Sequence, residues 1–408
     1  MSPNNTFTRS PWSDAASAEE LATWSAVAEQ VAVEVAKDAL ERDKDSIHPV
    51  NVLDVLRESG LTNLMVPAQF GGHGAHWETA FLVTRIIARV DASVAQLLGY
   101  HWLNQACVTF YGPDESRQAE WYKRSAANKW MWSDSFNPVS PDLSIVAEGE
   151  NYVLNGFKRF STGAAIADII IAGGIAEGGE YDGQLIVFTL DGKRAGIEHI
   201  DDWDHLGYRS SASGSVKYTN VVVTPADIIG ADQEEPFSAV VTPGVQLLFG
   251  NVYLGIAEGA LEQAKHLTLA RPNAWFLSSV DKYAQDPITH RLVGDLVAKT
   301  ASVEALAEKL NKYFDEVIAL GGATTLEDRS QLEIKIAALK VVSTDVALEV
   351  SSKVYELTGA SSTRSSIGLD LHWRNIRTHS LHDPVDYKRI EVGNYFLNGE
   401  YAPISLYT

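Results

Sequence analysis

The sequence predicts a multidomain α+β protein in which helices come first, a small β domain follows and a helix bundle ends the chain. Three observations predict this order. Apolar residues recur at helical spacing up to about residue 128, short strands separated by turn residues fill the middle, and helical periodicity returns from Gly244 onward. The chain has 408 residues and is 45% hydrophobic, which is enough for two or three cores. We place the domains at 1–129, 130–237 and 238–408.

The first domain is expected to be all-α. Residues 1–17 are polar and are expected to be loosely attached. Apolar side chains then recur every three or four residues over 18–43, which predicts a helix, and 50–60 predicts a shorter helix ended by a glycine. Residues 77–92 and 93–111 are typical of two more apolar helices.

The second domain is expected to be a small barrel-like β domain. Residues 152–160 alternate around Asn155-Gly156, a pair typical of a β-hairpin turn. Glycine and aspartate separate the other strands, which we predict at 168–172, 184–188 and 215–223.

The third domain is expected to be a four-helix bundle. Long helices are predicted at 247–270, 287–320 and 326–357, and bundles of this kind often form oligomer interfaces. Alternating βα units and a G-x-G-x-x-G turn are both missing from the sequence, which argues against a Rossmann nucleotide fold.

Composition limits the function classes. A net charge of −20 argues against a nucleic-acid partner, because phosphate binding needs clustered Lys and Arg. The single cysteine, Cys107, excludes a disulfide within the chain, and its apolar surroundings favour a buried hydrophobe over a reactive thiol. The N-terminus lacks a basic-then-apolar signal pattern, and no apolar run is expected to be long enough to cross a bilayer. We expect a cytoplasmic protein.

Residues 373–384 are the most informative part of the chain, because they combine two Arg, two His and one Asp. Imidazoles gain and lose protons near neutral pH, and a nearby carboxylate can fix their tautomer. His379, His382 and Asp383 are therefore candidate catalytic residues. The alternatives are a polar helix end with an ion network, or a metal site, to which His372 would add a further ligand.

The order of helices, strands and helices resembles the acyl-CoA dehydrogenase fold over essentially the whole chain. Three segments resemble more narrowly the flavin-dependent monooxygenase branch of that family, the one that includes the dibenzothiophene monooxygenases. These segments are 251–257, the run Asp201-Asp202-Trp203 with Gly207 and 213–215, and 373–384 followed by Tyr387-Lys388.

This resemblance implies a two-component oxygenase. A separate NAD(P)H-dependent flavin reductase would supply reduced FMN, with FAD the less favoured flavin. The reduced flavin would meet O2 in the pocket, form a C4a-hydroperoxide and deliver one oxygen atom to a small molecule. The substrate would be a small sulfur compound, such as a sulfide or sulfinate, or a heteroaromatic such as indole. A homotetramer is also expected.

The resemblance also assigns residues. Tyr100 joins His379, His382 and Asp383 in the expected catalytic set, without a metal. Phe160, Thr162 and Trp203 are expected at the flavin ring, and Arg291 at the flavin phosphate of a neighbouring subunit. The expected cofactor set also includes Asp134, where the family has asparagine, and the expected substrate set contains Gln96, where the family has histidine, and Trp275.

These departures leave alternatives open. A carboxylate at Asp134 would suit a polar or cationic substrate, so an amine N-hydroxylase is a near variant. An acyl-CoA dehydrogenase with tightly held FAD would use Asp383 as its base. A non-catalytic flavin-binding or scaffold protein of the same fold is a third possibility. The aromatic loop around Trp275 is either a lid over the substrate or an oligomer contact.

Overall fold

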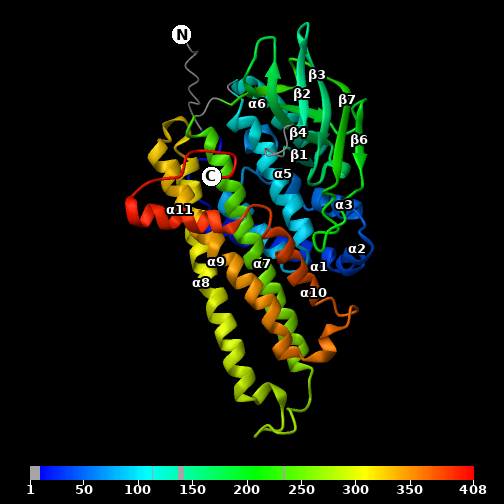
Figure 1. Ribbon diagram of the computed structural model, residues 1–408, viewed down its shortest axis with the longest axis vertical. Coiled ribbons are helices and arrows are strands. Elements are labelled where there is room, and N and C mark those ends of the chain that lie inside the picture. Colours follow the sequence, from blue (N-terminus) through cyan, green and yellow to red (C-terminus); the bar gives the residue numbers. More distant parts are fainter. Residues whose placement is uncertain (1–9, 113, 137–141, 233–234) are drawn as a thin grey trace.

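The computed structural model describes residues 10–112, 114–136, 142–232 and 235–408. Helices at the start of the chain pack between a β domain and a long helical bundle, so the molecule is elongated with the β domain at one end (Figure 1). The predicted order of helices, strands and helices is confirmed. Because the last N-terminal helix ends at Asn128 and the first strand begins at Trp132, we keep 1–129, 130–237 and 238–408 as proposed domain boundaries.

The described residues of the N-terminal domain form six α-helices. The helix predicted over 18–43 is interrupted at Lys37 and Asp38, so it forms two separate helices. The bounds are α1 (Ala18–Ala36), α2 (Ala39–Asp45), α3 (Val50–Glu58), α4 (Trp77–Ala88), α5 (Ala92–Phe110) and α6 (Glu115–Asn128).

The expectation that residues 1–17 are loosely attached is wrong for the described residues 10–17. The Trp12 indole is 3% exposed, donates to the Met65 carbonyl oxygen at 3.1 Å and packs edge-on against Trp77. A buried indole contributes about 2 kcal/mol or more through its apolar area, which explains why this polar segment is held. Residues 1–9 lie outside the described residues.

The central domain is a mixed sheet whose strands run in the order β6-β7-β3-β2-β4-β5-β8, with β1 paired to β4. Among the described strands, the ends of this path do not pair with each other, so the sheet curves without closing. The strand bounds are β1 (Trp132–Ser135), β2 (Leu143–Glu148), β3 (Asn151–Lys158), β4 (Ile169–Glu177), β5 (Leu185–Asp191), β6 (Ile197–Ile200), β7 (Ser215–Val223) and β8 (Ile228–Ala231).

The hairpin predicted at Asn155-Gly156 is wrong. Both residues lie inside β3, where the register against β7 shifts between Leu154 and Gly156. Gly156 has φ +135°, and a Cβ there would meet the Asp142 carbonyl oxygen at 1.9 Å, so glycine permits a bulge and a close approach instead of a turn. The chain reverses earlier, between β2 and β3.

The C-terminal domain is a bundle of three long helices with two shorter ones packed on it, and α4 lies against α7 and α8. Asp286 and Thr325 accept backbone N–H groups at the starts of α8 and α9, which explains where these two helices begin. The bounds are α7 (Val241–Leu269), α8 (Pro287–Ile318), α9 (Leu326–Thr358), α10 (Asp370–His379) and α11 (Val385–Asn398).

The expectation that no apolar run is long enough to cross a bilayer needs correction. Residues 238–269 pass that test of length and composition, and 83% of the most apolar window is buried inside the protein. This segment contains α7, which is surrounded by α4, α5, α8 and α9. Its apolar character therefore reflects a central position in the bundle.

Candidate active site

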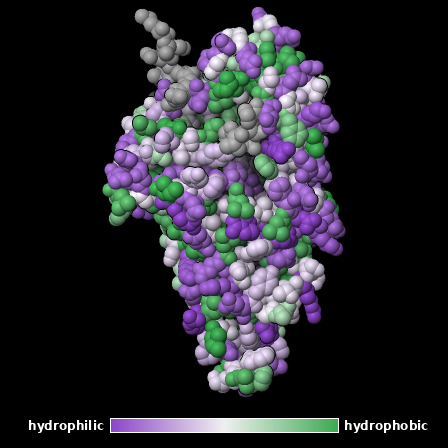
Figure 2. Space-filling view, in the orientation of Figure 1, coloured by the Kyte–Doolittle hydropathy of each residue, from purple (hydrophilic) through white to green (hydrophobic). Residues whose placement is uncertain are grey.

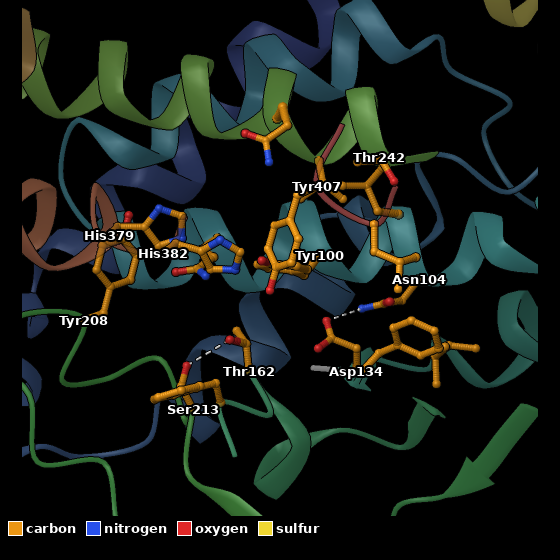
Figure 3. A pocket seen from close by; sticks show the side chains of 18 of the residues that line it. Tyr100, Asn104, Asp134, Thr162, Tyr208, Ser213, Thr242, His379, His382 and Tyr407 are labelled. Carbon is orange, nitrogen blue, oxygen red and sulfur yellow. Dashed lines mark hydrogen bonds between the residues drawn. The ribbon is translucent and has the colours of Figure 1, made fainter. Parts of the chain in front are cut away.

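A cavity of about 550 Å³ lies where the three domains meet. Helix α5 forms one wall, the β domain and the loop before β7 form a second, and the start of α7 forms a third. The end of α10, the turn after it and the C-terminal residues Leu406 and Tyr407 complete the lining. Figure 3 shows His379 and His382 at one end of this cavity, the pair Asp134 and Asn104 at the other, and Tyr100 between them.

The β-domain wall carries rings and hydroxyls. Trp203 stacks on His205 with ring centroids 3.9 Å apart, and Phe160 meets Trp203 edge-on at 6.0 Å. Phe160 has φ +62° and is 53% exposed, so a strained backbone holds an open ring at the cavity. The Thr162 and Ser213 hydroxyls are 3.0 Å apart and buried (Figure 3). This wall offers flat ring faces beside hydrogen-bonding groups.

His379 is buried beside the cavity as a neutral imidazole. Burial lowers the pKa of His379 well below its usual value, and the charges of His382 and Lys340 lower it further. The Tyr253 hydroxyl lies 2.8 Å from Nδ1 and donates to the His379 carbonyl oxygen at 3.1 Å. Because a hydroxyl has one proton, Nδ1 is then the donor and Nε2 carries the lone pair. Nε2 is buried without a hydrogen-bond partner among the described residues.

His382 lines the cavity next to His379, with ring centroids 5.5 Å apart. Its Nδ1 lies 3.2 Å from an Asp383 carboxylate oxygen. Asp383 is buried and does not line the cavity, so the carboxylate expected in the catalytic set lies behind the imidazole.

Lys340 of α9 is the partner that holds Asp383. Its ammonium is 1% exposed, donates to the Asp383 carboxylate and donates to Gln246 Oε1 at 2.6 Å. Burial alone would raise the pKa of Asp383, but the hydrogen bond with His382 and the charge of Lys340 outweigh it and lower that pKa. Asp383 is therefore ionised at neutral pH.

The other end of the cavity is rich in acceptors. Asp134 on β1 accepts the Asn104 amide at 3.1 Å (Figure 3), and burial raises the pKa of Asp134 to about 6. Gln96 is 5% exposed, and its Oε1 has no hydrogen-bond partner in the described residues. Burial, followed by the charge of Asp134, raises the pKa of Tyr100 well above its usual value, so the phenol stays neutral.

Eight of the eleven expected site residues line this one cavity, and three do not. Asp383 lies behind His382. Arg291, near the start of α8, is exposed and distant from the cavity of its own chain, so its proposed role across a subunit boundary stays a prediction. Trp275 is 63% exposed in the loop joining α7 to α8, at the tip of the bundle (Figure 1). The idea that it covers the cavity of its own chain is wrong, because α7 carries the chain away from the cavity over about 35 Å.

Sequence reasoning missed several residues that complete the site. Lys340, Gln246, His205, Tyr253 and Asn104 were not expected there. Lys340 did leave a signal, since it lies among the apolar, buried positions of α9, where Arg329 is the other buried cation. The others look like ordinary helix or loop residues in the sequence. Within the described parts of the chain, no group of three or more His, Cys, Asp or Glu residues is arranged to hold a metal, and His372 pairs with Gln263 instead.

An acyl-CoA dehydrogenase fold with a ring-lined cavity between its sheet and its bundle defines a flavoprotein class. The chain matches the acyl-CoA dehydrogenase N-terminal domain over residues 17–129, the middle domain over 136–221 and the C-terminal domain over 247–387. The protein belongs to the acyl-CoA dehydrogenase family.

Within that family, the expected resemblance to the flavin-dependent monooxygenases is confirmed by three relatives. The probable FMNH2-dependent monooxygenase SfnC of Pseudomonas putida is 35% identical over 94% of this chain and 97% of its own length. The methanesulfinate monooxygenase MsuC of Pseudomonas fluorescens superimposes with a TM-score of 0.91 at 34% identity, covering 94% of this chain and 99% of its own. The dibenzothiophene monooxygenase TdsC of Paenibacillus, solved with FMN and indole, superimposes with a TM-score of 0.91 at 32% identity. The match covers 95% of this chain and 100% of the TdsC chain.

Proposed function

We propose that this protein is the oxygenase component of a two-component system that uses reduced FMN and O2 to oxygenate a small sulfur-containing or heteroaromatic molecule. The observation that carries the proposal is the cavity itself. It brings flat ring faces on the β-domain wall into the same cavity as a neutral imidazole whose Nε2 has no partner in the described protein. Relatives that are named for FMNH2, or solved with FMN, support the flavin and the monooxygenase reaction.

The residues present fit a flavin. Trp203 and Phe160 offer ring faces for an isoalloxazine, and the Thr162 hydroxyl offers a hydrogen bond to its polar edge. A cavity of about 550 Å³ has room for a flavin ring and a small substrate. When bound, reduced FMN supplies the electrons that activate O2.

The chain's own residues would then orient groups and move a proton. The neutral His379 accepts a hydrogen bond at Nε2 without competing for charge. His382, held at Nδ1 by Asp383, gives up or takes a proton at Nε2. Lys340 keeps Asp383 ionised and in place, so both act through His382 as positioning residues. The apolar walls exclude water, which protects a reactive oxygen species from hydrolysis.

The dehydrogenase alternative is poorly supported by the position of Asp383. A base that removes a proton from a thioester must reach the substrate within hydrogen-bonding distance. The Asp383 carboxylate is paired with a buried ammonium and lies outside the cavity lining. An ion-paired carboxylate with a lowered pKa is also a weak base.

We infer from the acceptor-rich end that the substrate carries a hydrogen-bond donor or a polar group. Asp134 and Gln96 both present oxygen atoms, and the Asn104 amide satisfies only part of this demand. An indole N–H or an amine would suit this end, and these remain candidates beside sulfides and sulfinates. The amine keeps N-hydroxylation open as a near variant.

Exposed hydrophobic side chains are the basis for a proposed homotetramer. Hydrophobic side chains are exposed on α11 and at the tip between α7 and α8, and Figure 2 shows hydrophobic residues at that tip. The exposed members include Trp275, Phe276, Leu277, Ile390, Phe396 and Leu397. We propose that they contact other copies in a homotetramer in which Arg291 reaches a neighbouring flavin phosphate. We also propose a cytoplasmic location, where a reductase can deliver reduced flavin. Light scattering should give about four times the mass of one chain.

The decisive experiment supplies reduced FMN with a flavin reductase, NADH and isotopically labelled O2, and screens sulfides, sulfinates, indoles and amines by mass spectrometry. One labelled oxygen atom in a product supports the proposal. The protein should purify nearly colourless, whereas a tightly held yellow flavin would favour a dehydrogenase. The variant His382→Ala should lose oxygenation while its FMN affinity stays near that of the wild type.

A further inference from the structure

Arg377 of α10 is a cation that lines the cavity without a partner. Of the described residues that line the cavity, it is the single Lys or Arg. Its Nε is buried and has no hydrogen-bond partner, and its guanidinium forms no ion pair within the described parts of the chain. The mechanism outlined above does not use it.

The preceding turn of the same helix shows how this region treats an arginine that belongs to the scaffold. Arg374 binds Asp370 through Nε at 2.7 Å, pairs with Asp43 through both terminal nitrogens and donates to the Leu206 carbonyl oxygen at 3.0 Å. A carboxylate is therefore available for one arginine and is not provided for the other. The carboxylate in the cavity lining, Asp134, is held by Asn104 and forms no ion pair with Arg377.

The surroundings of Arg377 are also rigid. Gly207 packs so closely on the Arg374 carbonyl oxygen that a Cβ there would lie 2.3 Å from it, and the Tyr208 N–H donates to Asn375 Oδ1 at 2.8 Å. The loop that carries Trp203 and His205 is thus fixed against α10. A side chain that lines the cavity from this helix has its backbone position set before a ligand arrives.

Burying the Nε of Arg377 without an acceptor is unfavourable, and an anionic ligand would supply that acceptor. The planar fork of arginine matches the paired oxygens of a phosphate or a sulfinate and forms short, charge-assisted hydrogen bonds with them. Neutral sulfides and indoles offer no such group.

We propose that Arg377 is the centre of an oxyanion-binding subsite in the cavity, which takes either the phosphate of FMN or the acid group of a sulfinate substrate. The sulfinate case rests on the proposed monooxygenase function, whereas the phosphate case needs only flavin binding. In both cases the ligand supplies the negative charge that no described residue provides to Arg377.

Equilibrium binding tests this subsite without turnover. The variants are Arg377→Gln, which removes the charge, and Arg377→Lys, which keeps the charge and loses the fork. Arg364→Gln removes an exposed arginine outside the cavity lining and is the matched control. Calorimetry compares FMN with riboflavin, which lacks the phosphate. It then compares methanesulfinate with indole on the FMN-loaded protein.

Arg377→Gln should weaken one anionic ligand by about tenfold to a hundredfold, the value of a charge-assisted hydrogen bond, and leave its neutral counterpart within about twofold. Loss of FMN affinity alone assigns the phosphate, and loss of methanesulfinate affinity alone assigns the acid group. Arg377→Lys should fall between the wild type and Arg377→Gln. The proposal is overturned if Arg377→Gln binds all four ligands with the affinity of the wild type. It is also overturned if Arg377→Gln weakens the binding of each anion and of its neutral counterpart equally.

The outcome for the proposed function is separate. The wild type could form no oxygenated product from any class of substrate, while Arg377→Gln weakens the binding of FMN and leaves the binding of riboflavin unchanged. In that case the monooxygenase proposal fails and the subsite stands. If labelled products form and Arg377→Gln binds every ligand normally, the function stands and the subsite fails.

Discussion

Replacing Lys340 by methionine tests whether the candidate site depends on a buried charge pair. Methionine keeps the length and removes the charge, so the Asp383 carboxylate loses the ammonium that pairs with it. Both side chains are almost fully buried, at 1% and 8% exposure, so water cannot take the place of the lost partner. Breaking a buried pair on one side costs about 3–5 kcal/mol. We expect Lys340→Met to lower the free energy of unfolding by that amount at neutral pH.

The double variant Lys340→Met with Asp383→Asn separates charge from packing. Removing both partners of a buried pair is often close to neutral, so the double variant should recover most of the lost stability. Chemical denaturation at neutral pH, followed by circular dichroism, gives the comparison. Arg85→Met is the matched control, because it removes another buried, carboxylate-paired cation away from the cavity.

A double variant as unstable as Lys340→Met would refute the reasoning, since the loss would then come from packing. A pH series gives a second check. The pKa of Asp383 is lowered in the folded protein, so the stability from its ionised form is present above the unfolded pKa and is lost as pH falls through the folded one. The stability gap between wild type and Lys340→Met should therefore narrow in acid.

Three further predictions follow from single contacts. Asp134→Asn should abolish a rise in affinity for an amine or indole as pH increases through about 6, measured by calorimetry, because the pKa of Asp134 is raised to about 6 by burial. His76→Gln should lower the melting temperature at pH 6.5 and have little effect above pH 9. The hydrogen bond to Glu20 raises the pKa of His76 to about 9. The protonated His76 therefore stabilises the fold fully below pH 6.5, and this stabilisation is lost as the pH rises through about 9. Tyr253→Phe removes both hydrogen bonds to His379, and the loss of the one that orients the imidazole at Nδ1, worth about 1 kcal/mol, should slow oxygenation about fivefold with unchanged FMN affinity. Unchanged turnover would contradict this.

Much of the architecture could be read from local patterns. The periodicity of apolar residues predicted where α7, α8 and α9 begin and end, to within a few residues for most of these positions. It could do so because a helix buries a face that repeats every 3.6 residues. The run that ends in His379, His382 and Asp383 stood out because five chargeable side chains in twelve residues are visible in any linear reading. The resemblance of whole segments to a known family then supplied Tyr100 and Trp203, which no local pattern would have selected.

Local patterns failed where a neighbour from elsewhere in the chain changed the outcome. Asn155-Gly156 has the composition of a turn, yet close approach of the Asp142 backbone and pairing with β7 keep it within a strand. Trp12 lies in a polar segment whose composition predicts loose attachment, yet Met65 and Trp77 hold it. In both cases tertiary contacts outweigh a local preference of about 1 kcal/mol.

The sequence by itself determined the order of the elements, the lengths of the long helices and the identities of the two imidazoles at the end of α10 and in the turn that follows it. Only the tertiary structure decided what those imidazoles touch. Lys340 lies 43 residues before Asp383, and Tyr253 lies 126 residues before His379. The physical reason is that helical periodicity depends on neighbours three or four residues apart, whereas a buried charge pair depends on how separate helices pack. That packing also left Arg377 facing a cavity while Arg374 gained its carboxylates.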